Sequence, residues 1–223
     1  MRIQKFLSEQ KIASRREAER YIQQGLIKVN GVVEKNPATQ IDPEHDVVEL
    51  LAGASKAMGE KITIAINKPR GLLSSPHLLP QEYRQLNAVG RLDKASEGLL
   101  LLSNDGAVTG AVTSDRHLIE KEYEVSVHEC VTASKINKMA SGIELEDGLT
   151  LPAKVKQLGD HEFRIVLREG RKHQIRRMCE AMHLTVANLK RLRIGTINLG
   201  TLALGKFRRL STQEVAALKV ISS

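Results

Sequence analysis

Four consecutive leucines, Leu99–Leu102, place the strongest constraint on how this 223-residue chain can fold. Gly98 precedes the run, and an Asn-Asp-Gly sequence at 104–106 follows it. A short apolar run between turn residues is typical of a β-strand buried on both faces. The run therefore predicts a central strand, in a core that must be aliphatic because the chain has no tryptophan and only 3% aromatic residues.

The loop that leads into this strand carries Asp93, between Arg91 and Lys94 in the sequence GRLDKASEG. A loop gives a substrate access and the adjoining strand gives rigidity, so Asp93 is a candidate catalytic group. Three roles fit the residues alone: a structural ion pair with an arginine, a magnesium ligand in phosphate chemistry, or a nucleophile or base acting on an RNA nucleotide. The spacing does not choose among them.

Two further strands are predicted on either side of this one in the sequence. One is the alternating sequence KITIAINK at 61–68, which ends at Lys68 before a proline. The other is KEYEVSV at 121–127, whose strict alternation puts Tyr123 on the same face as two valines. From composition alone, a tyrosine in that position belongs to the core more often than to a site.

Positive charge is concentrated toward the C-terminus. The whole chain has a formal net charge of +8, whereas the segment 164–209 alone holds twelve Lys or Arg and two Glu, a net of +10. A concentrated basic surface predicts a polyanionic partner, for which nucleic acid is the first choice. Two strands around a glycine-containing turn are predicted for LKRLRIGTINLGTLALGKFRRL, and we expect them to bring Lys190, Arg191, Arg193 and Arg208 into this basic region.

A loop entering a helix is predicted for EGRKHQIRRMCEAMH, because apolar residues recur from Ile175 to Met182 at the spacing i, i+3, i+4 and i+7. Three residues in this stretch belong to types that bind metals, namely His173, Cys179 and His183. Their spacing matches no familiar metal site, and the cysteine lies on the apolar stripe. We therefore expect no metal.

The first forty residues predict a small separate module. Ser14 and Glu17 form a capping box that marks the start of a helix, and Gly25 marks its end. Asn30 and Gly31 then join two short β-prone runs, a pairing that favours a type I′ hairpin turn. Eight Lys or Arg against four Glu give residues 1–41 a net charge of +4, which suits docking on phosphates, although the helix arginines also fit a solvated face.

This module resembles the alpha-L RNA-binding domain, the kind named after ribosomal small-subunit protein four, along MRIQKFLSEQKIASRREAERYIQQGLIKVNG. The resemblance implies an RNA-binding accessory domain in which Arg15, Arg16 and Lys28 contact RNA. The sequence DPEHDVVELLAGASKAMGE predicts the last strand of the module and then a linker. We therefore expect one domain at 1–60 and a second at 61–223.

Four motifs behind the module resemble, in this order, the RsuA/RluB/RluE/RluF family of ribosomal RNA pseudouridine synthases: INKPRG, GRLDKASEGLLLLSNDG, KEYEV and EGRKHQIRRM. The resemblance implies an α+β catalytic domain on a mixed, largely antiparallel sheet, with the active-site cleft across its middle. It also implies a reaction without a cofactor. Asp93 attacks the target uridine at carbon 6 or at the anomeric carbon, the glycosidic bond breaks, and the uracil turns and is rejoined through carbon 5.

The same resemblance implies roles for other residues. A nucleotide in folded RNA must be flipped out to be reached, and Arg91 is implied to contact it or to replace it in the RNA. Tyr123 stacks on the uracil, and Arg176 keeps Asp93 ionised, with Arg171 as the alternative partner. Phosphates are implied to be held by Lys68, Lys172, Arg177 and Lys190.

The target RNA is expected to be large-subunit ribosomal RNA, because HQIRRMCEAM and SRREAERYI look closer to the large-subunit enzymes; small-subunit ribosomal RNA and transfer RNA are the alternatives. A non-catalytic RNA-binding or ribosome-assembly protein would need neither Asp93 nor Tyr123. A nuclease or phosphotransferase would need metal-binding carboxylates that the sequence does not offer. We expect a monomer. We also expect a cytoplasmic protein without membrane contact, because its apolar runs fall far short of the ~20 residues that span a bilayer and its start lacks the apolar core of a secretory signal.

Overall fold

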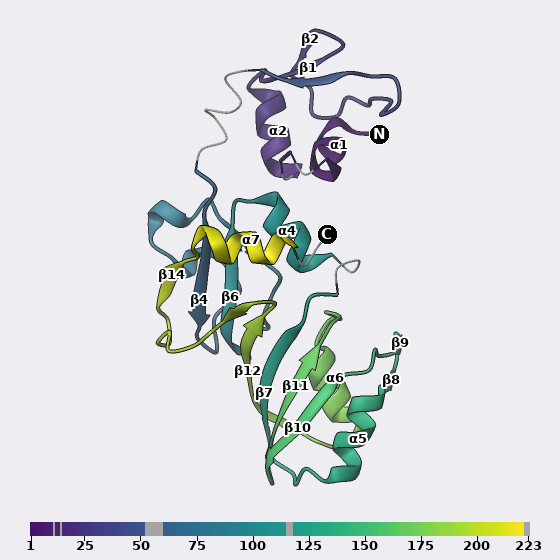
Figure 1. The fold of residues 1–223 in the computed structure, drawn as a ribbon, viewed down its shortest axis with the longest axis vertical. Helices are drawn as coiled ribbons and strands as arrows, with labels where there is room; N and C mark the ends of the chain where they lie inside the picture. Colours follow the sequence, from purple (N-terminus) through teal and green to yellow (C-terminus); the bar gives the residue numbers. More distant parts are fainter. Residues whose placement is uncertain (11, 14, 52–59, 115–117, 221–223) are drawn as a thin grey trace. The chain divides into compact units, whose positions relative to one another are not determined.

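The structure is a computed structural model that describes residues 1–10, 12–13, 15–51, 60–114 and 118–220 (Figure 1). The chain separates into two compact units. The small unit consists of Met1–Ile62 with Ser103–Ala107, and the large unit consists of Thr63–Leu102 with Val108–Ser223. None of the described helices is long and apolar enough to span a membrane.

The small unit packs two helices against a three-stranded antiparallel sheet of order β2-β1-β3. The elements are α1 (Ile3–Glu9), α2 (Arg15–Gln23), β1 (Ile27–Val29), β2 (Val32–Glu34) and β3 (Val48–Leu50). The predicted helix and hairpin are confirmed, since Asn30 and Gly31 both have the positive φ of a type I′ turn, 51° and 78°. The predicted cap, Ser14, lies outside the described residues.

The large unit is built on one mixed sheet (Figure 1). β12 runs antiparallel to β7 and parallel to β6, while β10, β11 and β7 form an antiparallel series and β14 is antiparallel to β4. The predicted mixed, largely antiparallel sheet is confirmed. The main strands follow the order β10 (Lys154–Gly159), β11 (Glu162–Leu167), β7 (Lys121–Val127), β12 (Val186–Ile194), β6 (Glu97–Ser103), β4 (Thr63–Lys68) and β14 (Phe207–Arg209).

Short elements complete the large unit. β5 (Asn87–Val89) pairs with β6, β13 (Ile197–Asn198) pairs with β12, and β8 (Glu144–Leu145) forms a separate hairpin with β9 (Gly148–Leu149). Two single-turn 3₁₀ helices, η1 (Pro76–Leu78) and η2 (Gln81–Tyr83), lie between β4 and β5.

Helices cover the sheet in two hydrophobic clusters. In one cluster, α5 (Ala133–Ser141) and α6 (Gln174–Ala181) pack on strands β7, β11 and β12. In the other, α4 (Gly106–Thr113) and α7 (Thr212–Val220) pack on β6 and β12. The predicted apolar stripe of α6 is confirmed, because all four of its members are buried.

The leucine run forms β6, and residues 98–103 are all buried, as a central strand requires. β6 approaches β12 so closely at Gly98 that a side chain there would not fit. A Cβ atom at Gly98 would lie 2.3 Å from the carbonyl oxygen of Arg191, and the φ of 103° also disfavours any residue with a side chain. Glycine therefore allows the parallel pairing of these two strands.

Replacing Gly98 by alanine should destabilise the protein by roughly 3 kcal/mol, because the new methyl group meets backbone and the backbone angle becomes strained. Gly110 is the matched control. It lies in α4 with open space around its Cα, so Gly110→Ala should stabilise by about 0.5–1 kcal/mol. Chemical denaturation of both variants measures the effect, and equal stabilities would contradict the close approach.

Candidate active site

A pocket of about 190 Å³ lies in the large unit. Five segments form its walls: the loop between β5 and β6, the end of α4, the start of β7, the loop that leads into α6 with the first residues of that helix, and β12. The pocket is lined by several of the predicted site residues, namely Arg91, Asp93, Tyr123, Arg171 and Arg176. Segments far apart in the sequence thus meet at one cavity.

The carboxylate of Asp93 is about one-third exposed and faces two groups of the α6 segment. His173 Nε2 lies 3.3 Å from one carboxylate oxygen, and Arg176 Nε lies 3.9 Å from the other. Arg176 also donates from Nη2 to the carbonyl oxygen of Ala95 at 3.1 Å. One guanidinium therefore contacts both the backbone and the side chain of the Asp93 loop.

Arg171, the alternative partner for Asp93, is engaged elsewhere. Its Nε donates to Glu169 at 3.0 Å, and its Nη1 donates to the carbonyl oxygen of Gly148 at 2.7 Å. Its Nη2 donates to the carbonyl oxygen of Leu149. Arg171 thus fastens the β8–β9 hairpin to the pocket wall, and Arg176 is the arginine beside Asp93.

His173 was not among the predicted catalytic or RNA-binding residues. It precedes α6 in the left-handed conformation, with φ 52° and ψ 28°, which turns its ring toward Asp93. Histidine is among the residues that adopt this conformation more readily than most. In the sequence, His173 belongs to a stretch with three residues of metal-binding types. Among the described residues, no group of three His, Cys, Asp or Glu side chains could hold a metal ion.

Tyr123 lines the pocket and also packs against the hydrophobic cluster of α5 and α6. Its neighbour across the strand pair is Arg191 on β12, whose guanidinium carbon lies 6.0 Å from the centre of the tyrosine ring. The ring is half-buried, with part of it in the core and part in the pocket.

The predicted phosphate contact of Lys68 is not supported by the structure. Its side chain is completely buried at the end of β4, and Nζ donates to the carbonyl oxygens of Pro69 and Leu72 at 3.0 and 2.7 Å. Burial lowers the pKa of the ammonium group, and the nearby negative charge of Asp93 partly opposes that effect. Lys68 therefore lies inside the protein, near enough to Asp93 for their charges to interact.

Arg191 also lies inside the protein and does not belong to the basic surface. It is 2% exposed. Its Nε donates to the carbonyl oxygen of Leu99 at 2.7 Å, and its Nη1 donates to that of Arg91 at 3.3 Å. Arg191 thus ties strand β6 and the Asp93 loop to β12.

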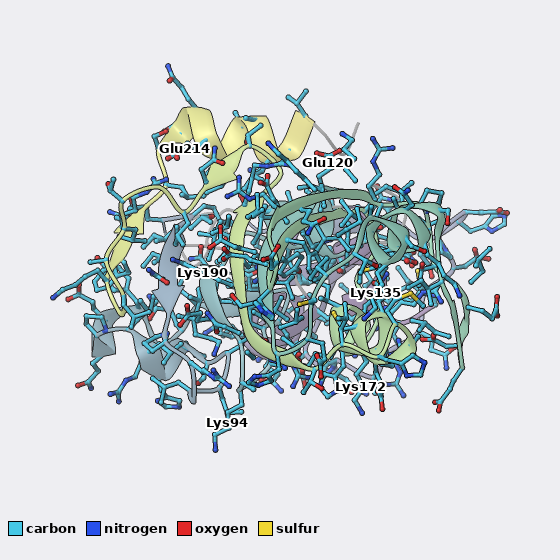
Figure 2. The ribbon with its side chains drawn as sticks, turned by 90° about the horizontal axis from the view of Figure 1, so that it is seen from below. Lys94, Glu120, Lys135, Lys172, Lys190 and Glu214 are labelled. Carbon is cyan, nitrogen blue, oxygen red and sulfur yellow. The ribbon has the colours of Figure 1, made fainter. Side chains whose placement is uncertain are left out.

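Several other arginines of the basic segment are paired with carboxylates. Arg177 makes a two-point contact with Asp147, at 2.8 and 3.0 Å. Arg193 pairs with Glu120 and Glu122, and Arg208 pairs with Glu214, so carboxylates offset the charge that these two were expected to bring to the basic region. Among the predicted phosphate contacts of the large unit, Lys172 is exposed and Lys190 is partly exposed (Figure 2).

The predicted contacts of the small unit lie on α2 and β1. Arg15 is exposed at the start of α2 and Lys28 is partly exposed on β1. The side chain of Arg16 lies outside the described part of the structure.

Comparisons with known proteins agree with this geometry. The sequence profile described as RNA pseudouridylate synthase matches residues 62–181, and that of the S4 domain matches residues 1–48. A relative from Aquifex aeolicus (strain VF5), named an uncharacterized RNA pseudouridine synthase, is 37% identical over 98% of this chain and 93% of its own length. The chain belongs to the RNA pseudouridine synthase family. The predicted family, fold and enzyme class are confirmed.

Other relatives of this synthase carry more specific names. The dual-specificity RNA pseudouridine synthase RluF of Escherichia coli (strain K12) is 34% identical over 98% of this chain and 78% of its own length. Ribosomal small subunit pseudouridine synthase A of Yersinia pestis is 35% identical, with 98% of both chains covered. A crystal structure of a pseudouridylate synthase superposes with a TM-score of 0.74 at 31% identity, covering 98% of this chain and 99% of its own.

The contact between Arg177 and Asp147 gives the synthase a testable acid sensitivity. Hydrogen bonding to Arg177 lowers the pKa of Asp147 from 3.8 to about 2. A carboxyl group whose pKa is lower in the folded than in the unfolded protein stabilises the folded state when the pH is above the unfolded-state pKa. This stabilisation is lost as the pH falls through the folded-state pKa.

Asp147→Asn should therefore melt at a lower temperature than the wild type at pH 5–7, and the gap should close as the pH falls from about 4 to about 2. Thermal melting of both proteins across this range measures it. Asp160→Asn, in the exposed turn between β10 and β11, is the control and should follow the wild type at every pH. A gap that persists unchanged to pH 2 would contradict the ion pair.

Proposed function

We propose that this synthase isomerises a specific uridine of large-subunit ribosomal RNA to pseudouridine, with Asp93 as the nucleophile. The observation that carries the proposal is the position of the Asp93 carboxylate: it lines the same pocket as Tyr123 and lies 3.9 Å from the guanidinium of Arg176. An anionic nucleophile, a cation that orients it and an aromatic surface for a base are the groups that this reaction needs.

The reaction proceeds without a cofactor, because the uracil is both the leaving group and the incoming nucleophile. Asp93 attacks either carbon 6 of the base or the anomeric carbon of the ribose. The bond from N1 to the anomeric carbon breaks, the uracil turns, and a bond from carbon 5 to the anomeric carbon forms. The bond between Asp93 and the substrate also breaks, which returns the carboxylate to its starting state. The proton on carbon 5 is lost and N1 gains one, so nothing is oxidised or reduced.

Each neighbouring side chain has a distinct task in this proposal. Arg176 orients the carboxylate and offsets its charge. Tyr123 stacks on the uracil and keeps it in the pocket while it turns. Arg91, which is exposed at the pocket rim, contacts the RNA from which the uridine has been flipped.

The RNA phosphates are held by Lys and Arg side chains that take no part in the reaction itself. In the large unit we assign phosphate contacts to Lys172 and Lys190, which are at least partly exposed. In the small unit we assign them to Arg15, Arg16 and Lys28. Residues 1–60 then dock the RNA and residues 61–223 carry out the isomerisation, in a monomer that works in the cytoplasm.

The second candidate target is small-subunit ribosomal RNA. It is favoured by the 35% identity to ribosomal small subunit pseudouridine synthase A of Yersinia pestis, over 98% of both chains. The 34% identity to RluF, which is named for dual specificity, is nearly the same. Overall identity therefore does not decide between the targets, and the RNA itself must be mapped.

The proposal is tested by mapping pseudouridines in both ribosomal RNAs, by carbodiimide labelling and primer extension, in cells that lack the gene. We expect one large-subunit site to disappear and to return when the wild-type gene is restored. Asp93→Asn should not restore it, whereas Asp160→Asn, a substitution in an exposed turn, should. Loss of a small-subunit site would move the target, and loss of no site would send the search to transfer RNA.

The purified Asp93→Asn protein should bind the mapped RNA within about tenfold of the wild-type affinity, a difference of ~1.4 kcal/mol. The substitution removes a nucleophile and leaves the phosphate contacts in place. Turnover at the wild-type rate by this variant would eliminate Asp93 as the nucleophile.

The docking role of the small unit is tested by replacing Arg15 and Lys28 with glutamine together. Each lost phosphate contact should lower the salt slope of binding by about 0.7–0.9, so the double variant should bind more weakly and depend less on salt. Binding is measured between 50 and 200 mM salt. The control, Lys135→Gln with Lys156→Gln, loses the same charge from the large unit and should keep the wild-type slope. An unchanged slope in the Arg15 and Lys28 variant would show that these two residues do not dock RNA.

A further inference from the structure

Two exposed leucines lie directly beside the Asp93 loop. Leu72 is 45% exposed and Leu73 is 65% exposed. The segment that carries them is hydrogen-bonded to the Asp93 loop on both sides of the pair. The amide of Gly71 donates to the carbonyl oxygen of Lys94 at 2.7 Å, and the hydroxyl of Ser74 bonds to the backbone of Leu92. The backbone that carries the two leucines therefore lies beside the Asp93 loop.

The exposure of these leucines is enforced by the structure around them. The buried ammonium of Lys68 binds the carbonyl oxygen of Leu72 from inside the protein at 2.7 Å. On the other side of the segment, Arg70 donates to the carbonyl oxygen of Ala187 at 2.9 Å. An apolar pair fixed in this way in contact with water is prepared for a partner that covers it.

The charges around the pair identify the kind of partner. Arg70, Arg91 and Lys94 are all exposed on the two loops that frame the leucines. In Figure 2, Lys94 and Lys172 lie in the lower part of the view, whereas Glu120 and Glu214, of the same large unit, lie in the upper part. An apolar contact with three exposed cations on the same two loops is complementary to nucleic acid, which combines a phosphate backbone with flat base surfaces.

We propose that Leu72 and Leu73 form an apolar wedge that packs against the RNA bases next to the target uridine and fills the space left when that uridine enters the pocket. The proposal rests on the proposed function. Flipping a nucleotide out of a stack breaks base contacts, and inserted leucine side chains are one way in which proteins replace such contacts. Leu73, the more exposed of the two, is the leading contact.

The experiment uses the full-length protein and two RNA hairpins that contain the mapped uridine. In the first hairpin the uridine is paired and stacked; in the second it faces an abasic site, so that flipping it costs little. The rate of pseudouridine formation is measured in single turnover, and 2-aminopurine next to the uridine reports unstacking by its fluorescence.

Leu73→Ala should slow the reaction on the paired hairpin by about tenfold or more and reduce the fluorescence rise, while its rate on the abasic hairpin stays within about threefold of the wild type. Leu73→Met keeps an apolar side chain of similar length and should restore most of the rate. Leu158→Ala is the matched control, because Leu158 is a 40% exposed leucine on β10, an end strand that is separated from β4 by four strands in the sheet order.

Other results would overturn the wedge. A Leu73→Ala variant that is equally slow on both hairpins has damaged the chemistry, and one that is unaffected on both has no role in flipping. Melting temperatures equal to the wild type establish that the variants are folded. If the wild type converts neither hairpin, the proposed function fails and the wedge fails with it. If the wild type converts them and Leu73→Ala leaves both rates unchanged, the wedge alone is rejected.

Discussion

The active-site loops depend on two buried cations, Lys68 and Arg191. Burying a charge is costly unless polar groups surround it. Here backbone carbonyl oxygens accept hydrogen bonds from both cations, while Nη2 of Arg191 is buried without a hydrogen-bond partner. Lys68 binds those of Pro69 and Leu72, and Arg191 binds those of Leu99 and Arg91. Lys68 therefore holds the loop after β4, and Arg191 holds the Asp93 loop at Arg91 and strand β6 at Leu99. The Asp93 loop is in turn hydrogen-bonded to the segment that Lys68 holds.

Many positive charges of the large unit stabilise its fold and are not free to bind RNA. The segment 164–209 has a net charge of +10, yet Arg171, Arg177, Arg193 and Arg208 are all paired with carboxylates. These pairs fasten the β8–β9 hairpin, β7 and α7 to their neighbours. A count of charges along the sequence therefore overstates the surface that phosphates can reach. The exposed cations around the pocket, such as Lys94 and Lys172, form a smaller set.

The sequence pattern predicted the elements well where a local period identifies them. The leucine run, the alternation in 121–127 and the apolar stripe that begins at Ile175 each predicted a segment that the structure contains. The positions of Lys68 and Arg191 could not be predicted in this way. Arg191 is 92 residues from the carbonyl oxygen of Leu99 that it binds, so its burial follows from strand pairing across the whole unit. In the sequence it is one more basic residue in a basic run.

The His173 contact escaped prediction for a related reason. A left-handed residue at the start of α6 turns the histidine ring toward Asp93, and no periodic pattern marks such a residue. Likewise, the sequence could name Arg171 and Arg176 as alternatives because both lie in the same motif. Only the position of the β8–β9 hairpin, which engages Arg171 through its carbonyl groups, separates the two.

The scarcity of aromatic residues explains why aliphatic side chains would contact bases in this synthase. The chain has three tyrosines and three phenylalanines, all within the described residues. Tyr123 is the one that lines the pocket. In the large unit, Phe163 is buried in the core, and Tyr83 and Phe207 pack edge to face with ring centres 5.7 Å apart. Tyr123 and the imidazole of His173 are therefore the rings that line the pocket, and in the proposed wedge the leucines provide the contact for the neighbouring bases.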